Sequence, residues 1–191
     1  MEVDDHHLSP EEIEAIAVRI DRPIVLVGMM GVGKSSVGKR LSTILHCPFA
    51  DADDEIEAAA QMTIPEIFAA YGEAGFRDGE RRVIARLIEG DAGRKVIATG
   101  GGAFCNPDTR ALILERTIAV WLDSDVETLI DRTSRKDNRP LLKEGDPREI
   151  LTRLRDERRP AYSQAPIHVL SGSGPHGRTV ANVLKGIAQW L

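Results

Sequence analysis

The sequence has little cysteine, few aromatic residues and no long apolar run. Its 191 residues include two cysteines, Cys47 and Cys105, and neither stands in a Cys-x-x-Cys or Cys/His cluster. This usage argues against a disulfide framework and a structural zinc site, and it indicates a reducing compartment. The apolar runs, such as 24–27 and 118–122, are far shorter than the ~20 residues that span a bilayer, so we expect no membrane segment.

The chain also lacks the features of nucleic-acid binding and of secretion. Aromatic residues make up 4% and the formal net charge is −5, whereas a nucleic-acid surface is typically basic with aromatic platforms. Residues 1–7 are acidic and polar, unlike a signal peptide, so we expect a cytoplasmic protein. Residues 1–70 carry a net charge of −8 and residues 71–191 a net charge of +3, so the positive charge lies in the second half. Small anionic ligands fit this composition better than nucleic acid does.

The apolar pattern predicts one α/β domain. Ser9-Pro10 followed by Glu12 is typical of a helix start, which predicts a short helix over about 10–20. Continuous apolar runs at 24–27, 95–98, 117–122 and 166–170 alternate with helical patterns, as strands buried on both faces do. Alternating strands and helices predict a mostly parallel sheet with helices on both faces.

A phosphate-binding loop follows the first predicted strand. Residues 28–35 read Gly-Met-Met-Gly-Val-Gly-Lys-Ser and match G-x-x-x-x-G-K-[ST] in full. Glycines let backbone N–H groups approach phosphate oxygens closely, Lys34 brings a positive charge, and Ser35 brings a hydroxyl for a magnesium ion. The helix that begins here directs the positive end of its dipole at the same phosphates. The motif predicts nucleotide binding but leaves open what receives the γ-phosphate.

Four further segments suggest an acceptor site, although each also has an ordinary structural interpretation. Asp51 and Asp53 lie two residues apart at a strand end, so they point the same way, toward the crevice above the carboxyl ends of the strands. Alternatively, Asp53 and Asp54 cap the start of a helix. Three glycines at 100–102 after a buried strand indicate a close approach by another backbone or a ligand. Arginines beside Phe76, within 138–142 and within 158–162 are surface charges if each is taken alone.

Taken in order, these segments resemble the shikimate kinase family. The matching elements are Gly28–Ser35, Asp51-Ala52-Asp53, Phe76-Arg77, Thr99-Gly100-Gly101-Gly102, Arg139-Pro140-Leu141-Leu142, and Arg158 four residues before Tyr162. The match runs from about Arg22 to Leu191. It implies a three-layer P-loop kinase fold with a five-stranded parallel sheet, similar to nucleoside monophosphate kinases, over residues 22–191. Residues 1–21 are then an extension, 52–82 a substrate-binding segment and 133–147 a closing lid.

The resemblance also implies an activity and an acceptor site. The family transfers the γ-phosphate of ATP to the 3-hydroxyl of shikimate, giving shikimate 3-phosphate and ADP on the route to chorismate. Asp53 would bind the shikimate hydroxyls and orient or deprotonate the attacking one. Arg77 and Arg158 would hold the carboxylate, since two planar guanidinium groups fix its orientation better than one. The backbone of Gly101 would also face the substrate.

The same resemblance assigns the nucleotide and metal ligands. Mg²⁺ would bind Ser35 directly and Asp51 through its water shell. Arg132 would pack on the adenine ring, and Arg139, brought in by lid closure, would contact the transferring phosphoryl group opposite Lys34. The remaining ATP contacts would come from Gly31, Val32, Gly33, Lys34, Ser35 and Ser36.

One segment departs from the family pattern, and two other functions are alternatives to shikimate phosphorylation. Residues 171–175 align with the segment that cradles adenine but hold serine and glycine where some relatives have a basic residue, which suggests looser adenine specificity. Another small-molecule kinase, for gluconate or a nucleoside monophosphate, is the nearest alternative. A nucleotide-binding switch that has lost its acceptor would lack the acceptor-side charges, and this sequence keeps them. We expect a monomer.

Overall fold

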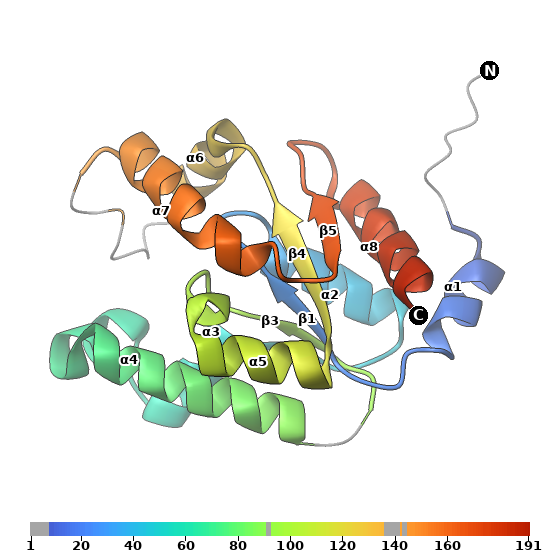
Figure 1. The fold of residues 1–191 in the computed structure, drawn as a ribbon, viewed down its shortest axis with the longest axis horizontal. Coiled ribbons are helices and arrows are strands. Elements are labelled where there is room, and N and C mark those ends of the chain that lie inside the picture. Colours follow the sequence, from blue (N-terminus) through green and yellow to red (C-terminus); the bar gives the residue numbers. More distant parts are fainter. Residues whose placement is uncertain (1–7, 91–92, 136–141, 143–144) are drawn as a thin grey trace.

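The protein is built on a single parallel sheet. The computed structural model describes residues 8–90, 93–135, 142 and 145–191. Five strands lie in the order β2-β3-β1-β4-β5, and every neighbouring pair is parallel (Figure 1). They are β1 (Ile24–Val27), β2 (Phe49–Asp51), β3 (Val96–Ala98), β4 (Ile118–Asp123) and β5 (Ile167–Leu170). The predicted parallel α/β sheet of five strands is confirmed, with the first apolar run at its centre.

Helices cover both faces of this sheet. The helical elements of the described residues are α1 (Pro10–Ala17), α2 (Lys34–Ile44), α3 (Ala52–Ala60), α4 (Ile64–Glu89), the 3-10 helix η1 (Ala103–Cys105), α5 (Pro107–Arg116), α6 (Val126–Ser134), α7 (Pro147–Tyr162) and α8 (His176–Trp190). Helices α2 and α8 pack on one face, and α5 lies on the other. No helix among the described residues is both long and apolar enough to cross a bilayer.

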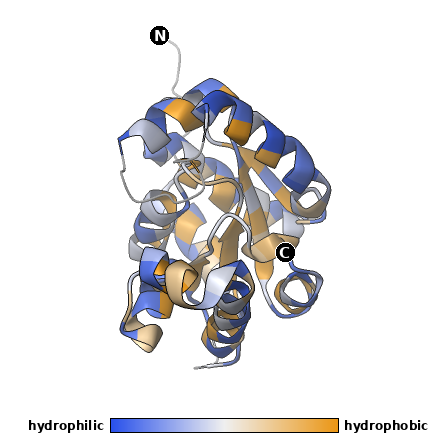
Figure 2. Ribbon diagram, turned by 90° about the vertical axis from the view of Figure 1, so that its left-hand side faces the viewer, coloured by the Kyte–Doolittle hydropathy of each residue, from blue (hydrophilic) through white to orange (hydrophobic). Residues whose placement is uncertain are grey.

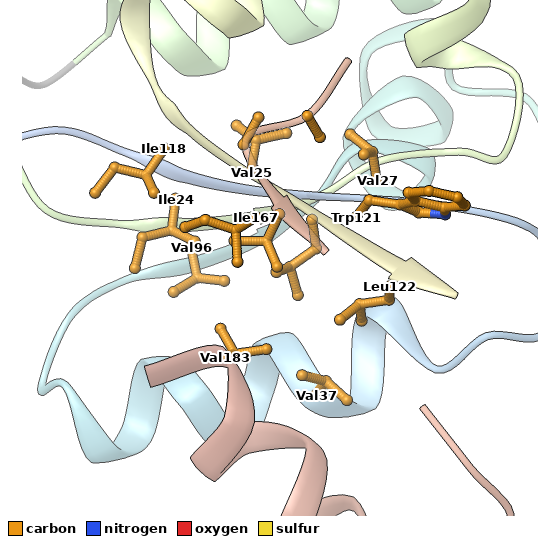
Figure 3. Close-up of a cluster of buried hydrophobic side chains, with 14 of the residues drawn as sticks. Ile24, Val25, Val27, Val37, Val96, Ile118, Trp121, Leu122, Ile167 and Val183 are labelled. Carbon is orange, nitrogen blue, oxygen red and sulfur yellow. The ribbon is translucent and has the colours of Figure 1, made fainter. Parts of the chain in front are cut away.

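The core lies between the strands and these two helical layers. All residues of β1, β3 and β4 are buried, because helices cover both of their faces. Val37 of α2 and Val183 of α8 lie on the side of the sheet from which Leu122 projects, whereas Trp121 projects from the opposite face (Figure 3). Hydrophobic residues gather on the strands and the inward sides of the helices, and hydrophilic ones face outward (Figure 2).

The N-terminal helix α1 is part of the packed domain. It begins with a capping box in which Ser9 accepts from the Glu12 backbone and Glu12 accepts from the Ser9 backbone. Its Ile16 and Ala17 are buried in the main core, and the helix packs against α8. The helix ends at Ala17, three residues before the predicted end, and Val18 after it is largely exposed.

Helices α3 and α4 form a side wall of the molecule. The long helix α4 begins at a capping box of Thr63 and Glu66, and it is bent at Gly72, where φ is +69° and ψ is −178°. A residue with a side chain rarely adopts this conformation, so glycine permits the bend. The predicted lid begins within α6 and ends at the start of α7, and residues 136–141, 143 and 144 between them lie outside the described residues.

Candidate active site

A large cleft opens at the carboxyl ends of β1, β2 and β3. Its volume is about 940 Å³, and it is lined by the loop after β1, the start of α3, the inner side of α4, and parts of α6 and α7. The strand order reverses at β1, and parallel α/β sheets bind ligands at such a point. The topology therefore brings the phosphate-binding loop and the acceptor-side residues of the sequence to one place.

The loop after β1 has the conformation that close phosphate contact requires. Gly28 has a φ of +140°, and a Cβ there would lie only 2.2 Å from the backbone oxygen of Leu122, so a larger residue is excluded. The Lys34 ammonium group donates to the backbone oxygens of Gly28 and Met29 at 2.7 and 2.8 Å. These bonds hold a nearly buried charge directly over the loop.

Ser35 and Asp51 bring two oxygen groups together beside this loop. The Ser35 hydroxyl donates to Asp51 Oδ2, while Asp51 Oδ1 accepts from the Asp53 backbone at 3.0 Å. No cluster of three or more His, Cys, Asp or Glu that could hold a metal occurs in the part of the chain the structure describes. Mg²⁺ at phosphate sites needs no such cage, because it keeps several waters and binds one or two protein oxygens plus phosphates. The pair of Ser35 and Asp51 fits that requirement.

Arg132 of α6 closes the nucleotide side of the cleft. Its guanidinium donates to the Val32 backbone oxygen at 2.8 Å and to the backbone oxygen of Gly172, with a longer contact of 3.4 Å to Ser171. Val32 itself is fully buried and does not line the cleft, so the structure does not place it among the residues open to a ligand. Gly31, Gly33, Lys34, Ser35 and Ser36 all line the cleft, and their role as ATP contacts stays a prediction.

His176, at the start of α8, is a cleft residue that the sequence analysis missed. Its Nδ1 is buried without a hydrogen-bond partner, and a Cβ on Gly33 would lie 3.2 Å from its ring. Burial, with the positive charges of Arg132 and Arg40, lowers its pKa, which keeps the ring neutral near pH 7. Its place directly after the Ser/Gly segment that borders the nucleotide side was the available signal.

The three glycines at 100–102 provide room for charged side chains from three helices. A Cβ on Gly100 would lie 2.8 Å from Glu80 Oε1 and 3.0 Å from Asp53 Oδ1. One on Gly102 would lie 2.5 Å from the Arg77 guanidinium. The predicted close approach is thus made mainly by side chains.

Gly101 is where the two halves of the cleft meet. A Cβ there would lie 3.0 Å from Arg158 Nη1 and 3.2 Å from the Met30 backbone nitrogen, which belongs to the phosphate-binding loop. The Tyr162 hydroxyl donates to the Gly101 backbone oxygen. Burial of Tyr162 raises the pKa of its hydroxyl, so it remains a donor.

Arg77 is held by a buried carboxylate. Its Nη1 lies 2.8 Å from Glu80 Oε2, and its Nη2 lies 3.6 Å from Glu73. Burial raises the pKa of Glu80, and the attraction of Arg77 only partly offsets this. Burial opposes the charge on Arg77, but Glu80 and Glu73 raise its pKa overall. Glu80 was not among the predicted site residues, although its spacing of three from Arg77 in a helix was a usable signal.

Two polar atoms at the glycines are buried without partners. They are Glu80 Oε1 and Arg158 Nη1. Buried polar groups are normally hydrogen-bonded, and exceptions often mark functional positions. An acceptor and a donor on the wall of one cleft suit a small polar molecule that carries both hydroxyl and carboxylate groups.

The structure corrects how Asp51 and Asp53 come to lie in the cleft. Asp51 ends β2 and is itself the cap of α3, whereas Asp53 lies in the first turn of that helix. The two side chains therefore do not share a direction by strand alternation, and that reason for the prediction was wrong. The alternative, that Asp53 and Asp54 cap the helix, was also wrong, because both lie in its first turn. All three aspartates nevertheless line the cleft. Arg139 lies outside the described residues.

Comparisons with known proteins find one family. The family model described as shikimate kinase matches residues 30–188. A shikimate kinase of Novosphingobium aromaticivorans is 66% identical over the whole of both chains. One of Caulobacter vibrioides is 57% identical over 88% of this chain and 83% of the relative.

A solved structure has the same fold. The shikimate kinase of Acinetobacter baumannii in complex with shikimate superposes with a TM-score of 0.82 at 35% identity, covering 93% of this chain and 97% of that one. Sequence, fold and the arrangement of the cleft point the same way, and the chain belongs to the shikimate kinase family.

Proposed function

We propose that this cleft transfers the γ-phosphate of ATP to the 3-hydroxyl of shikimate, giving shikimate 3-phosphate and ADP. The observation that carries the proposal is the meeting of a phosphate-binding loop with Asp53, Arg77 and Arg158 around one run of glycines. A nucleoside monophosphate acceptor carries no carboxylate for two arginines to hold. Gluconate does carry one, so the assay below compares it directly with shikimate. A regulatory nucleotide binder would need no acceptor groups at all.

The nucleotide binds in the half of the cleft formed by the loop and α6. Backbone N–H groups of residues 31–36 donate to the phosphates, with the dipole of α2 directed at them. Lys34 reaches the β- and γ-phosphate oxygens from its position over the loop. Arg132 packs against the base, and the backbone of the Ser/Gly segment borders it on the other side.

Ser35 and Asp51 would hold the divalent ion, which we assign as Mg²⁺. Ser35 would be the direct ligand, and Asp51 would act through water. When bound, the ion neutralises charge on the β- and γ-phosphates. The short bond between the two side chains places both oxygens beside the phosphate loop before any ligand arrives.

The acceptor binds in the other half, between α4 and α7. Arg77 and Arg158 clamp its carboxylate, and the Gly101 backbone contacts its ring. Asp53 orients the attacking hydroxyl. The hydroxyl oxygen bonds to the γ-phosphorus, the bond to the bridging oxygen of ADP breaks, and the hydroxyl proton passes to the Asp53 carboxylate. Lys34 and, as the resemblance implies, Arg139 stabilise charge on the transferring group.

The test is ADP release from Mg-ATP by the purified protein, with and without shikimate. We expect a rate that depends on shikimate, with the product identified by mass as the monophosphate. A Lys34→Ala variant provides the control, since it keeps the acceptor half intact. If shikimate fails to stimulate while gluconate or a nucleoside monophosphate does, the acceptor assignment is wrong.

We infer that the protein acts as a monomer. The phosphate-binding loop, Asp53, Arg77 and Arg158 line one cleft within a single chain, so no partner residue is needed to bring these groups together. Light scattering after size exclusion, at the concentration used for the assay, tests this. A dimer that retains activity after dilution to monomer would still support the one-chain site, whereas activity found only in the dimer would contradict it.

A further inference from the structure

The inward face of α7 carries two arginines with different surroundings. Leu151, Arg155, Arg158 and Tyr162 follow one another at spacings of four, three and four, which places them on one side of the helix. Leu151 and Tyr162 are buried. Arg158 lines the cleft, whereas Arg155 does not. Arg155 therefore belongs to the interface between α7 and the sheet.

Arg155 is tied to the end of β4 through a buried carboxylate. Its Nη2 lies 3.3 and 3.5 Å from the two carboxylate oxygens of Asp123, which is 5% exposed. The Ser124 backbone donates to the same carboxylate at 2.9 Å, and His168 Nε2 lies 3.3 Å away. A buried carboxylate needs such partners, because leaving it or its arginine alone is strongly unfavourable. Asp123 thus joins α7 to β4 and β5.

The turn that holds Arg158 is weakened by the helix sequence itself. Pro160 lies inside α7, and a proline removes the backbone donor that would bond to residue 156. Arg158 lies within the turn, residues 156–160, that lacks this bond. The turn is held on one side by Arg155 and on the other by Tyr162, which donates to Gly101.

A ring stack joins the two anchors of this turn. His168 stacks on Trp121 with ring centroids 4.0 Å apart and an interplanar angle of 11°. Trp121 in turn contacts Tyr162, with centroids 5.9 Å apart. The stacked rings of His168 and Trp121 therefore link Asp123 to Tyr162, because His168 contacts Asp123 and Trp121 contacts Tyr162.

We propose that Asp123 and Arg155 are positioning residues for acceptor binding, whose ion pair fixes the turn of α7 that presents Arg158 to the carboxylate. This inference rests on the proposed role of Arg158 and deepens it. Asp123 and Arg155 touch neither substrate. They act by keeping the guanidinium of Arg158 at the distance from Gly101 that the bound acid requires.

The decisive comparison is Arg155→Gln against Arg153→Gln. Arg153 lies on the same helix, but its side chain is 62% exposed and pairs with Glu157 at 3.5 Å. We expect Arg155→Gln to raise the KM for shikimate about tenfold, with kcat and the KM for ATP changed less than about twofold, because a small displacement of a binding group weakens only the ligand it holds. Arg153→Gln should change none of the three.

Rescue and coupling separate positioning from general stability. Arg155→Lys keeps a charge for Asp123 and should recover part of the lost affinity. Asp123→Asn should raise the same KM, and the double variant with Arg155→Gln should add little to it, as expected for one shared interaction. Equal losses in the KM for ATP, the KM for shikimate and kcat, or fully additive effects, would overturn the proposal.

An Arg158→Gln variant, measured in parallel, separates the positioning role of Arg155 from the binding role of Arg158. If it raises the KM for shikimate and Arg155→Gln does not, the positioning role is wrong and the acceptor site stands. If Arg158→Gln itself leaves that KM unchanged, the assignment of Arg158 to the carboxylate fails, and the inference built on it fails too.

Discussion

The nucleotide half and the acceptor half of the cleft are built from different material. The nucleotide half consists mainly of backbone: a glycine loop whose carbonyls hold Lys34, and a Ser/Gly segment whose carbonyl holds Arg132. The acceptor half consists of charged side chains from α3, α4 and α7 that crowd around three glycines. Backbone groups keep their positions when a neighbouring side chain changes, whereas converging charges depend on one another. Substitutions should therefore be more selective, and more costly, in the acceptor half.

The largest effect is expected from Asp53→Asn. The change keeps the shape of the side chain but removes the carboxylate that takes the hydroxyl proton, so kcat should fall by about 100- to 10,000-fold. Thermal unfolding should change little, and the KM for ATP should stay near its original value. Asp54→Asn, the next residue and also in the cleft, is the matched control. A variant at Asp53 that keeps most of its kcat would remove that residue from the reaction.

Arg77→Ala should separate the two halves most clearly. Loss of a charged hydrogen-bonding group is expected to raise the KM for shikimate by about 10- to 100-fold and to leave the KM for Mg-ATP near normal. Arg132→Ala should give the reverse pattern. Arg81→Ala, on the same helix and more exposed, is the control for α4. Equal loss of nucleotide affinity in Arg77→Ala would contradict the division of the cleft.

Gly102→Ala tests whether the acceptor half depends on empty space. The new methyl group would lie 2.5 Å from the Arg77 guanidinium, which is already fixed by Glu80 and must shift. We expect a rise of about tenfold in the KM for shikimate, less than for removal of Arg77 itself. Gly79→Ala, where a Cβ would meet nothing within 4 Å, controls for the change of glycine to alanine. Unchanged kinetics in Gly102→Ala would show that Arg77 has other productive positions.

The same contrast explains how much of the molecule could be predicted from sequence. The phosphate loop is a contiguous motif, and β1 and α2 around it follow from local apolar patterns, so the nucleotide half was largely predictable. The convergence of Arg77 and Arg158 came from the family resemblance. The burial of Glu80 and the tie between Asp123 and Arg155 depend on how separate helices pack, and no local pattern encodes that.

The relation of Asp51 to Asp53 shows the same limit on a smaller scale. Strand alternation predicted a common direction for the two side chains, yet the strand ends at Asp51 and the chain turns at once into α3. Both side chains reach the cleft because the Asp51 carboxylate caps the helix that carries Asp53. The residue at which the strand ends decides where the two side chains point. Element boundaries are the least reliable part of sequence interpretation.

The smallest effect, in stability and its pH dependence, is expected from Glu80→Gln. Burial raises the pKa of Glu80 above its ordinary value of 4.5, so the folded protein keeps this proton to a higher pH than the unfolded chain. The contribution of Glu80 to the free energy of unfolding is therefore complete below about pH 4.5 and declines as the pH rises through the raised pKa.

Glutamine cannot ionise, so the difference in unfolding free energy between the original protein and Glu80→Gln should shrink from acidic to neutral pH. Urea unfolding at a series of pH values measures this difference. Glu73→Gln is the control, because Glu73 also contacts Arg77 but is 63% exposed. A difference that grows with pH would mean that the attraction of Arg77 outweighs burial at Glu80. The ion pair between Glu80 and Arg77 would then stabilise the folded protein, and the charge on Glu80 would no longer lower its stability.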